Sequence, residues 1–471
     1  MSFTSITFWS FFVLVFAIYR IVPFRIQNRL LLVASQIFYG WWDWRFLGLL
    51  WITIISDYLI GKALHGTRDK IARKRLMTLS LFVNLGILAT FKYANFFSAE
   101  ASDLLDWLGI NHSVSILEIV LPIGISFYTF QSLSYVIDIY RKQLDPVNDL
   151  GDYALFVSFF PQLVAGPIER ASRLLPQVTR PREALNTISF RDGLYLVLFG
   201  LFMKLVIADN LATIVDYCFS LAPDQMGRLD VLLGAYAFTF QIYGDFYGYS
   251  CIAQGLALWM GFKLMFNFRT PFFSGSVSEF WQRWHISLSS WLRDYVYYSF
   301  GGARSRWKPY RNLLVTMALA GLWHGANWTF VLWGSFFGVC MAIERLYQTI
   351  QGTRKASGHL WNAFKIFCTF HIIVFSMMIF RSQSLDQLVS FIQTLKVGGS
   401  ANQNVLLYGS SLLAALCVPL LIYETWQYRS NDPLVLMKAN WRLRVIFLLV
   451  MVLSLFFFRA SSTVEFIYFQ F

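Results

Sequence analysis

The feature that most constrains this chain is a succession of long apolar segments joined by short loops. The segments recur from Ile6 to Phe458, and most are long enough, or nearly so, to cross a hydrocarbon core about 30 Å thick. Hydrophobic residues make up 57% of the chain and charged residues only 14%, which excludes a soluble domain of this length. The pattern predicts an all-α polytopic membrane protein forming a single domain over residues 1–471, with about eleven or twelve helices plus re-entrant or in-plane pieces.

The basic residues predict the topology of these segments. The chain has 39 Lys and Arg against 26 Asp and Glu, a formal net charge of +13. Such an excess could indicate nucleic-acid binding, but the basic side chains lie in short loops, as in Lys62–Arg75, which is typical of cytoplasmic loops in membrane proteins. The loop Ser98–Glu118 has four acidic and no basic residues, and we expect it outside. No nucleic-acid partner is predicted.

Two segments are predicted not to cross. Tyr153–Ile168 is short and is interrupted by Pro161, Gly166 and Pro167, and basic residues follow it, so it is interpreted as re-entrant. A re-entrant backbone is tolerated only against protein or a water-filled cavity, which indicates an internal chamber. Ser276–Phe300 is amphipathic with basic loops on both sides, and we expect a helix in the cytoplasmic interface.

One titratable residue, His324, lies in the middle of the apolar segment Thr316–Phe337. Leu313–Glu344 is predicted to form a hairpin or a pair of tilted half-helices, which places this histidine about 18 Å along, near mid-membrane. An ionisable group in a membrane segment costs several kcal/mol unless it faces protein or water, so it is a functional candidate. The alternative is a neutral imidazole bonded to a neighbouring helix. Gly321 and Gly325 would thin the helix there, as a substrate passage would need.

Three more polar positions are candidates. His285 lies at the edge of the apolar stripe of its amphipathic segment, where it could serve catalysis or anchor to lipid head groups. Gln241 and Asp245 lie in the apolar run Val231–Phe262, where they could line a cavity or bond between helices. The five cysteines contain no CxxC pair, and neither a metal site nor a disulfide framework is predicted.

The available chemistry favours acyl transfer. The sequence lacks the catalytic motifs of soluble hydrolases, the P-loop and the zinc-protease signature. A neutral histidine can act as a general base toward a hydroxyl, which is worth roughly 10² to 10⁴ in rate. Such a base suits transfer of an acyl group from an activated donor to an alcohol.

Several segments together resemble the membrane-bound O-acyltransferase family, whose signature core corresponds to approximately residues 117–345. They follow the family's order and continue to the closing FIYFQF; the four are Pro122–Arg141, Phe160–Arg170, Ser278–Tyr297 and Gly321–Gly334. The resemblance is strongest to bacterial members that O-acetylate alginate and other surface polysaccharides. It implies a ring of helices around a central funnel or tunnel.

The resemblance also implies roles for individual residues. His324 would be the general base, and His285 the second catalytic histidine, which positions donor or acceptor. The donor would be acetyl coenzyme A, with no permanently bound cofactor, and its phosphates could meet Arg283 and Arg293, although these arginines could equally bind lipid head groups. The residues expected to line the tunnel are Trp323, Asn327, Asp245 and Gln241.

The implied activity is O-acetylation across a bacterial inner membrane. An acetyl group would move from the cytoplasmic donor to an extracytoplasmic polysaccharide such as alginate, directly or through a periplasmic O-acetyltransferase partner. Cys251 stands where related sequences often have Asp, which leaves the acceptor open. The alternatives are D-alanyl transfer to teichoic acid, as in a related Gram-positive branch, and a lipid or glycan transporter that performs no chemistry.

Overall fold

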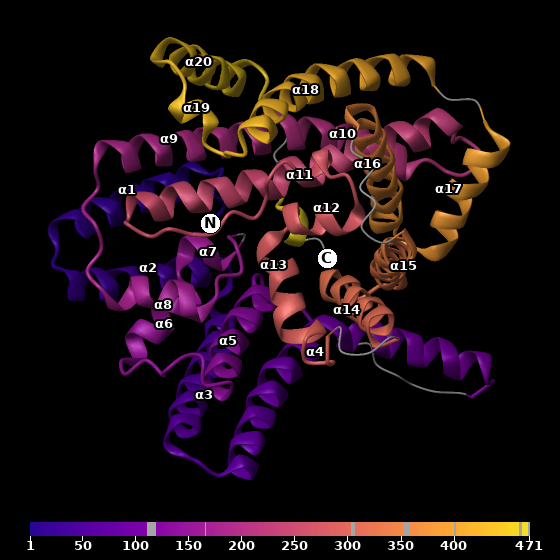
Figure 1. Cartoon of the computed structure of the whole chain (residues 1–471). Helices are drawn as coiled ribbons and strands as arrows, with labels where there is room; N and C mark the ends of the chain where they lie inside the picture. Colours follow the sequence, from indigo (N-terminus) through magenta and orange to yellow (C-terminus); the bar gives the residue numbers. More distant parts are fainter. Residues whose placement is uncertain are drawn as a thin grey trace. The chain divides into compact units, whose positions relative to one another are not determined.

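The structure is a computed structural model that describes residues 1–110, 119–164, 166–302, 307–351, 358–399, 402–460 and 464–469. These residues form helices and loops with no strand, which confirms the all-α prediction (Figure 1). They group into two compact units, an N-terminal unit of Met1–Phe190 with Leu256–Met265 and a C-terminal unit of Arg191–Gly255 with Phe266–Phe471. The single-domain organisation stays a prediction.

Long apolar helices confirm that the protein is a multi-pass membrane protein. Six stretches of the described residues are long and apolar enough to span a bilayer: Phe24–Gly66, Lys70–Trp107, Thr187–Ser220, Trp328–Ile350, His359–Arg381 and Gln403–Ser430. The number of crossings stays a prediction. Of the acidic loop predicted outside, residues 111–118 lie outside the described part of the chain.

The N-terminal unit consists of helices, three of which are joined by buried hydrogen bonds to one carboxylate. Its helices are α1 (Ile6–Ile21), α2 (Phe24–Asp43), η1 (Trp44–Phe46), α3 (Leu47–Gly66), α4 (Lys70–Trp107), α5 (Ile125–Tyr140), α6 (Leu150–Ser158), α7 (Phe160–Leu163) and α8 (Ala171–Thr179). The buried carboxylate of Asp57 on α3 accepts hydrogen bonds from Ser80 and Asn84 on α4 and from Ser132 on α5. These bonds satisfy a charge that would otherwise be expensive to bury.

The segment predicted to be re-entrant is broken into short buried helices. α6 ends at Ser158 and α7 begins at Phe160, because Phe159 has a non-helical backbone. Ala165 lies outside the described residues. α5 begins at Ile125, directly after Gly124, whose φ of +77° is a conformation that favours glycine.

The C-terminal unit contains the helices that carry the candidate residues. They are most of α9 (Thr187–Phe202), η2 (Met203–Ala208), α10 (Asp209–Ser220), most of α11 (Arg228–Trp259), η3 (Pro271–Phe273), α12 (Val277–Arg283), α13 (Ile286–Trp291), η4 (Leu292–Tyr297), α14 (Lys308–His324), α15 (Trp328–Gln351), α16 (His359–Arg381), α17 (Leu385–Val397), α18 (Gln403–Ser430), α19 (Val435–Lys438), α20 (Trp441–Phe457) and η5 (Ile467–Phe469). Two of them, η2 and η4, are π-helical turns, which often occur at functional sites.

The predicted hairpin around His324 is confirmed as α14 and α15, but its glycines have a different purpose from the one expected. A Cβ on Gly321 would lie 2.0 Å from the carbonyl oxygen of Phe330, and one on Gly334 would lie 2.1 Å from that of Met317. These glycines therefore allow the two helix backbones to touch, as small residues do in membrane bundles. Gly325, the other glycine expected to thin the helix, is also closely packed, since its added Cβ would lie 2.2 Å from the ring of Phe330.

The prediction of one continuous amphipathic helix over Ser276–Phe300 is wrong. α12 ends at Arg283, and α13 begins at Ile286. Between them His285 adopts the left-handed conformation with φ of +42°, and the backbone N–H of Ile286 donates to the carbonyl of Asn267. The break turns His285 away from the helical stripe on which the sequence placed it.

Candidate functional site

His324 lies at the C-terminal end of α14 inside an aromatic cage. Gly325 is extended and ends the helix, so the histidine stands at the turn of the hairpin. Its side chain is buried, and four rings surround the imidazole at centroid distances between 5.0 and 5.6 Å: Trp323, Trp333, Phe380 and Tyr468. This environment keeps water away from the ring while the turn gives it a fixed place.

His285 is fully buried at the break between α12 and α13. Phe246 packs edge-on against its imidazole at 4.5 Å, and Trp323 lies at 5.9 Å. Neither ring nitrogen has a hydrogen-bond partner among the described residues. Burial lowers the pKa of His285 to about 3, so the imidazole is neutral at physiological pH. The interpretation of this residue as an anchor to lipid head groups is wrong, because the side chain does not reach the surface.

The two histidines belong to one cluster. Trp323 contacts both imidazoles, and so does Tyr468, whose ring lies 6.3 Å from His285 and 5.6 Å from His324. Trp323 was predicted as a tunnel-lining residue, and the structure places it between the histidines. Tyr468 was not predicted individually; its only signal was its position in the closing FIYFQF, of which Gln470 and Phe471 lie outside the described residues.

A buried ionic cluster holds the segment that carries Tyr468. The ammonium of Lys204 lies 2.8 Å from carboxylate oxygens of both Asp209 and Asp245, and it donates to the carbonyl of Val464. Asp245 also accepts a hydrogen bond from the backbone N–H of Ile467. Asp245 was predicted to line the tunnel. Both of its oxygens are used for this anchoring, and a tunnel-lining role stays a prediction.

The two amides predicted to line the tunnel differ in their surroundings. Asn327 caps α15: its side-chain oxygen accepts from the backbone N–H of Thr329, and its amide donates to the carbonyl of Gln383. It is therefore a structural cap. Gln241 is buried on α11, and its carbonyl oxygen has no hydrogen-bond partner within the described part of the chain. A tunnel-lining role for Gln241 stays a prediction.

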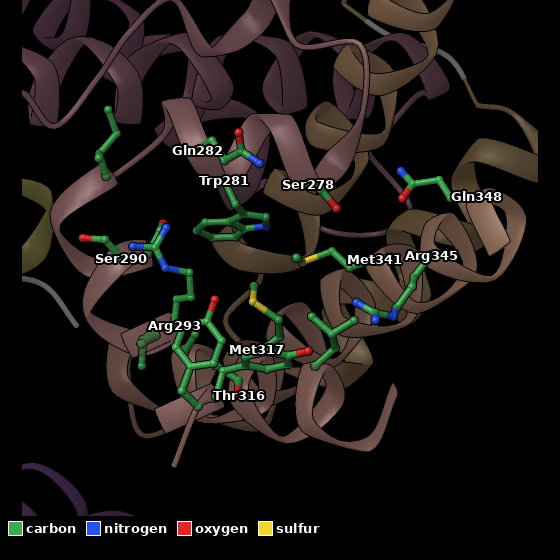
Figure 2. Close-up of a pocket in the computed structure, with 17 residues that line it drawn as sticks. Ser278, Trp281, Gln282, Ser290, Arg293, Thr316, Met317, Met341, Arg345 and Gln348 are labelled. Atoms are coloured by element: carbon green, nitrogen blue, oxygen red, sulfur yellow. The ribbon is translucent and has the colours of Figure 1, made fainter. Parts of the chain in front are cut away.

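A pocket of about 550 Å³ lies beside the histidine cluster (Figure 2). This volume lies in the range of ordinary small-molecule sites. Its lining includes Ile286, the residue after His285, and Ala320, one helical turn before His324. Trp281 forms another wall and packs edge-on against Trp333, which contacts His324. The pocket therefore ends within one residue or one helical turn of each histidine.

Of the two arginines predicted to meet the phosphates, only one lines this pocket. Arg293 lines it from η4 and pairs with Asp294. Arg283 does not line it: its guanidinium pairs with Glu279 and lies over the ring of Tyr428. A third arginine, Arg345 on α15, lines the pocket and was missed, because no pattern in the sequence relates it to η4.

Comparisons with known proteins agree with the resemblance noted above. Residues 147–382 match the membrane-bound O-acyltransferase family. The chain is 43% identical over 390 residues to the probable alginate O-acetylase AlgI of Azotobacter vinelandii, covering 82% of this chain and 76% of the relative. The chain belongs to the membrane-bound O-acyltransferase family. This membrane-bound O-acyltransferase is therefore an enzyme that transfers an acyl group to a hydroxyl.

Two other relatives show how the family varies. The membrane-bound O-acyltransferase described here is 30% identical over 487 residues to the peptidoglycan O-acetyltransferase of Helicobacter pylori, with 94% of this chain and 91% of the relative covered. It is also 30% identical over 296 residues to the teichoic acid D-alanyltransferase of Streptococcus thermophilus, covering 58% of this chain and 70% of the relative.

Proposed function

We propose that this enzyme takes an acetyl group from acetyl coenzyme A at the cytoplasmic face of a bacterial inner membrane. The acceptor is a hydroxyl of an extracytoplasmic polysaccharide, with alginate as the first candidate, and the transfer is direct or passes through a periplasmic partner. The name of the relative from Azotobacter vinelandii supports this acceptor.

One observation carries the chemical part of the proposal. His285 and His324 come from different elements, yet they share the rings of Trp323 and Tyr468 and lie next to a pocket of small-molecule size. Two packing histidines would have no reason to meet beside a cavity. A donor in this pocket would have its reactive end near both imidazoles.

His324 acts as the general base in this scheme. Its imidazole takes the proton of the acceptor hydroxyl while the oxygen attacks the thioester carbonyl. The carbon–sulfur bond then breaks, and the leaving thiolate receives the proton, so that an ester and a free thiol result. His285 is neutral and offers a hydrogen bond to donor or acceptor. General-base help of this kind is worth roughly 10² to 10⁴ in rate.

The test uses the full chain purified into nanodiscs with radiolabelled acetyl coenzyme A. Thioester loss and label transfer are followed for wild type, His324→Ala and the control His359→Ala, whose side chain is exposed. We expect His324→Ala to lose about 10² to 10⁴ in turnover, with an unchanged elution profile, and the control to match wild type. Equal turnover in wild type and His324→Ala would remove His324 from the mechanism. No thioester loss in either protein, with the acceptors supplied, would favour the transporter alternative.

The acceptor and the acyl group are tested separately. Alginate and peptidoglycan are supplied as acceptors in parallel, since the relative from Helicobacter pylori covers more of this chain than the alginate-type relative does. A D-alanyl thioester is supplied as a second donor because of the teichoic acid branch. Label on peptidoglycan alone would replace alginate as acceptor, and consumption of the D-alanyl thioester alone would replace acetate as the acyl group.

A further inference from the structure

The pocket beside the histidines is lined by positively charged side chains and by no negatively charged one. Its 17 lining residues include two arginines, Arg293 and Arg345, and no Asp or Glu. Buried or partly buried charges are normally paired within a protein. A cavity with two cations and no acidic lining residue is suited to an anion.

Arg345 is the lining arginine for which the described residues provide no ion-pair partner. It is partly buried on α15, and its guanidinium forms no ion pair with any residue that the structure describes. The neighbouring Glu344 lies at the edge of the pocket without lining it: its carboxylate accepts from the backbone N–H of Ser278 and from the amide of Gln348, both lining residues, and it forms no ion pair with Arg345 among the described residues. Arg293 differs, because Asp294 offsets its charge at 2.8 Å.

The two arginines face one another across the cavity. Figure 2 shows Arg345 reaching in from α15 and Arg293 on the opposite side, with Trp281 between them. Ile286, which follows His285, and Ala320, one helical turn before His324, are also lining residues. The lining thus carries a cation on two opposite sides.

We propose that Arg345, assisted by Arg293, binds the phosphate groups of the thioester donor and so directs its acyl end toward His285 and His324. The guanidinium is a planar fork of N–H donors that matches phosphate oxygens in pairs. Arg283 has no part in this recognition, since it does not line the pocket. The assignment rests on the proposed thioester donor, and it names the residue that distinguishes a phosphorylated donor from a thioester without phosphate.

Binding is measured first, because it does not depend on turnover. Coenzyme A and pantetheine, which has the same thiol arm without phosphates, are titrated into the full chain in phosphatidylcholine nanodiscs. The variants are Arg345→Gln, Arg345→Lys and the control Arg429→Gln, which changes an exposed arginine on α18 that does not line the pocket. We expect Arg345→Gln to weaken coenzyme A binding about 10-fold or more, since hydrogen bonds to charged groups are the stronger ones.

The remaining variants and ligands show which results would support or overturn the proposal. Arg345→Lys should recover part of the affinity for coenzyme A, pantetheine binding should be equal in all variants, and Arg429→Gln should match wild type. Coenzyme A affinity that is the same in wild type and Arg345→Gln would overturn the proposal. So would a protein that binds no coenzyme A and instead retains phosphatidylglycerol in an Arg345-dependent way, because the phosphate would then belong to a lipid.

Turnover separates this inference from the proposed function. If coenzyme A binding depends on Arg345 but acetyl coenzyme A is never consumed with any acceptor, the phosphate site stands and the acetyl-transfer function fails. If acetyl coenzyme A is consumed and its KM is the same in Arg345→Gln, the function stands and the phosphate site fails. A raised KM with an unchanged kcat supports both.

Discussion

Lys204 shows how a single side chain organises the region around the histidines. The lysine is almost completely buried and is enclosed by the carboxylates of Asp209 and Asp245. Removing one partner of a buried ion pair is costly because it leaves an uncompensated charge in the protein. Lys204 and Asp245 also hold the backbone at Val464 and Ile467, on either side of Phe466. A residue far from His324 in sequence therefore fixes one wall of its site.

Replacing Lys204 by Met should destabilise the protein by about 3 to 5 kcal/mol, because two aspartates would be left buried without a cation. The loss should appear as a lower midpoint of thermal unfolding in detergent. Lys438→Met serves as the control, since Lys438 forms an exposed pair with Asp432 that is worth no more than about 1 kcal/mol. Equal unfolding midpoints for the two variants would show that the cluster around Lys204 contributes little.

Glu169 should make stability depend on pH. Burial raises the pKa of its carboxyl to about 7, against the nearby charge of Arg173. A carboxyl whose pKa is raised by folding stabilises the protein fully at low pH, and this contribution is lost as pH rises through the folded pKa. We expect the unfolding midpoint of wild type to fall between pH 5 and pH 8 by more than that of Glu169→Gln. Glu183→Gln, an exposed acid, should behave as wild type, and parallel curves for all three proteins would refute the assignment.

For single residues, the sequence predicts which side chains belong to the site better than it predicts their contacts. His324 and His285 could be named because an ionisable group in an apolar segment is rare and costly. Tyr468 and Arg345 could not be named, because they meet the histidines and η4 only through the tertiary fold. The ion pair of Asp245 could not be predicted for the same reason, because its partner Lys204 lies on a different element.

Among the elements, the break between α12 and α13 explains why helix periodicity misled. The apolar positions of Ser276–Phe300 keep a helical spacing on both sides of His285, so the pattern alone indicates one helix. A single residue with φ of +42° is enough to change the direction of the chain. Histidine tolerates this conformation better than most non-glycine residues, but the residues next to it in the sequence do not indicate the break.

The contact between α14 and α15 should be sensitive to one methyl group. A Cβ on Gly334 would meet the backbone of Met317, which cannot move aside as a side chain could. We expect Gly334→Ala to destabilise the protein by about 1 to 3 kcal/mol and to lower turnover by displacing His324. Gly86→Ala on α4 is the control: nothing lies within 4 Å of its added Cβ, and alanine favours a helix by up to about 1 kcal/mol. A Gly334→Ala variant as stable as Gly86→Ala would contradict the close packing of the hairpin.

For the whole molecule, the sequence was sufficient for the class of fold and insufficient for its subdivision. Length and apolarity alone identify spans such as α16 and α18. The division into two units cannot be predicted from composition, since the boundary at Gly255 falls inside the continuous helix α11. Which helices share a core depends on contacts between distant segments, and hydropathy does not contain that information.

The orientation of the whole chain can be tested by labelling cysteines. The charge distribution places Lys70 in the cytoplasm and Asp103 outside. After replacement of the five native cysteines by alanine, Asp103→Cys should react with a membrane-impermeant maleimide in spheroplasts, whereas Lys70→Cys should react only after the membrane is opened. Both side chains are exposed, so access is decided by the bilayer. The opposite labelling pattern would invert the predicted topology.

The glycine contact in the hairpin also has a consequence for biogenesis. α14 is not among the six long apolar spans that the described chain contains, whereas α15 is. As α14 leaves the ribosome first, lipid is a poor solvent for it until α15 arrives to cover its backbone at Gly321. The two helices should then enter the bilayer together, and an insertion reporter should record poor integration of α14 alone and efficient integration of the pair. The place of His324 would thus be set during synthesis, before the remaining helices exist.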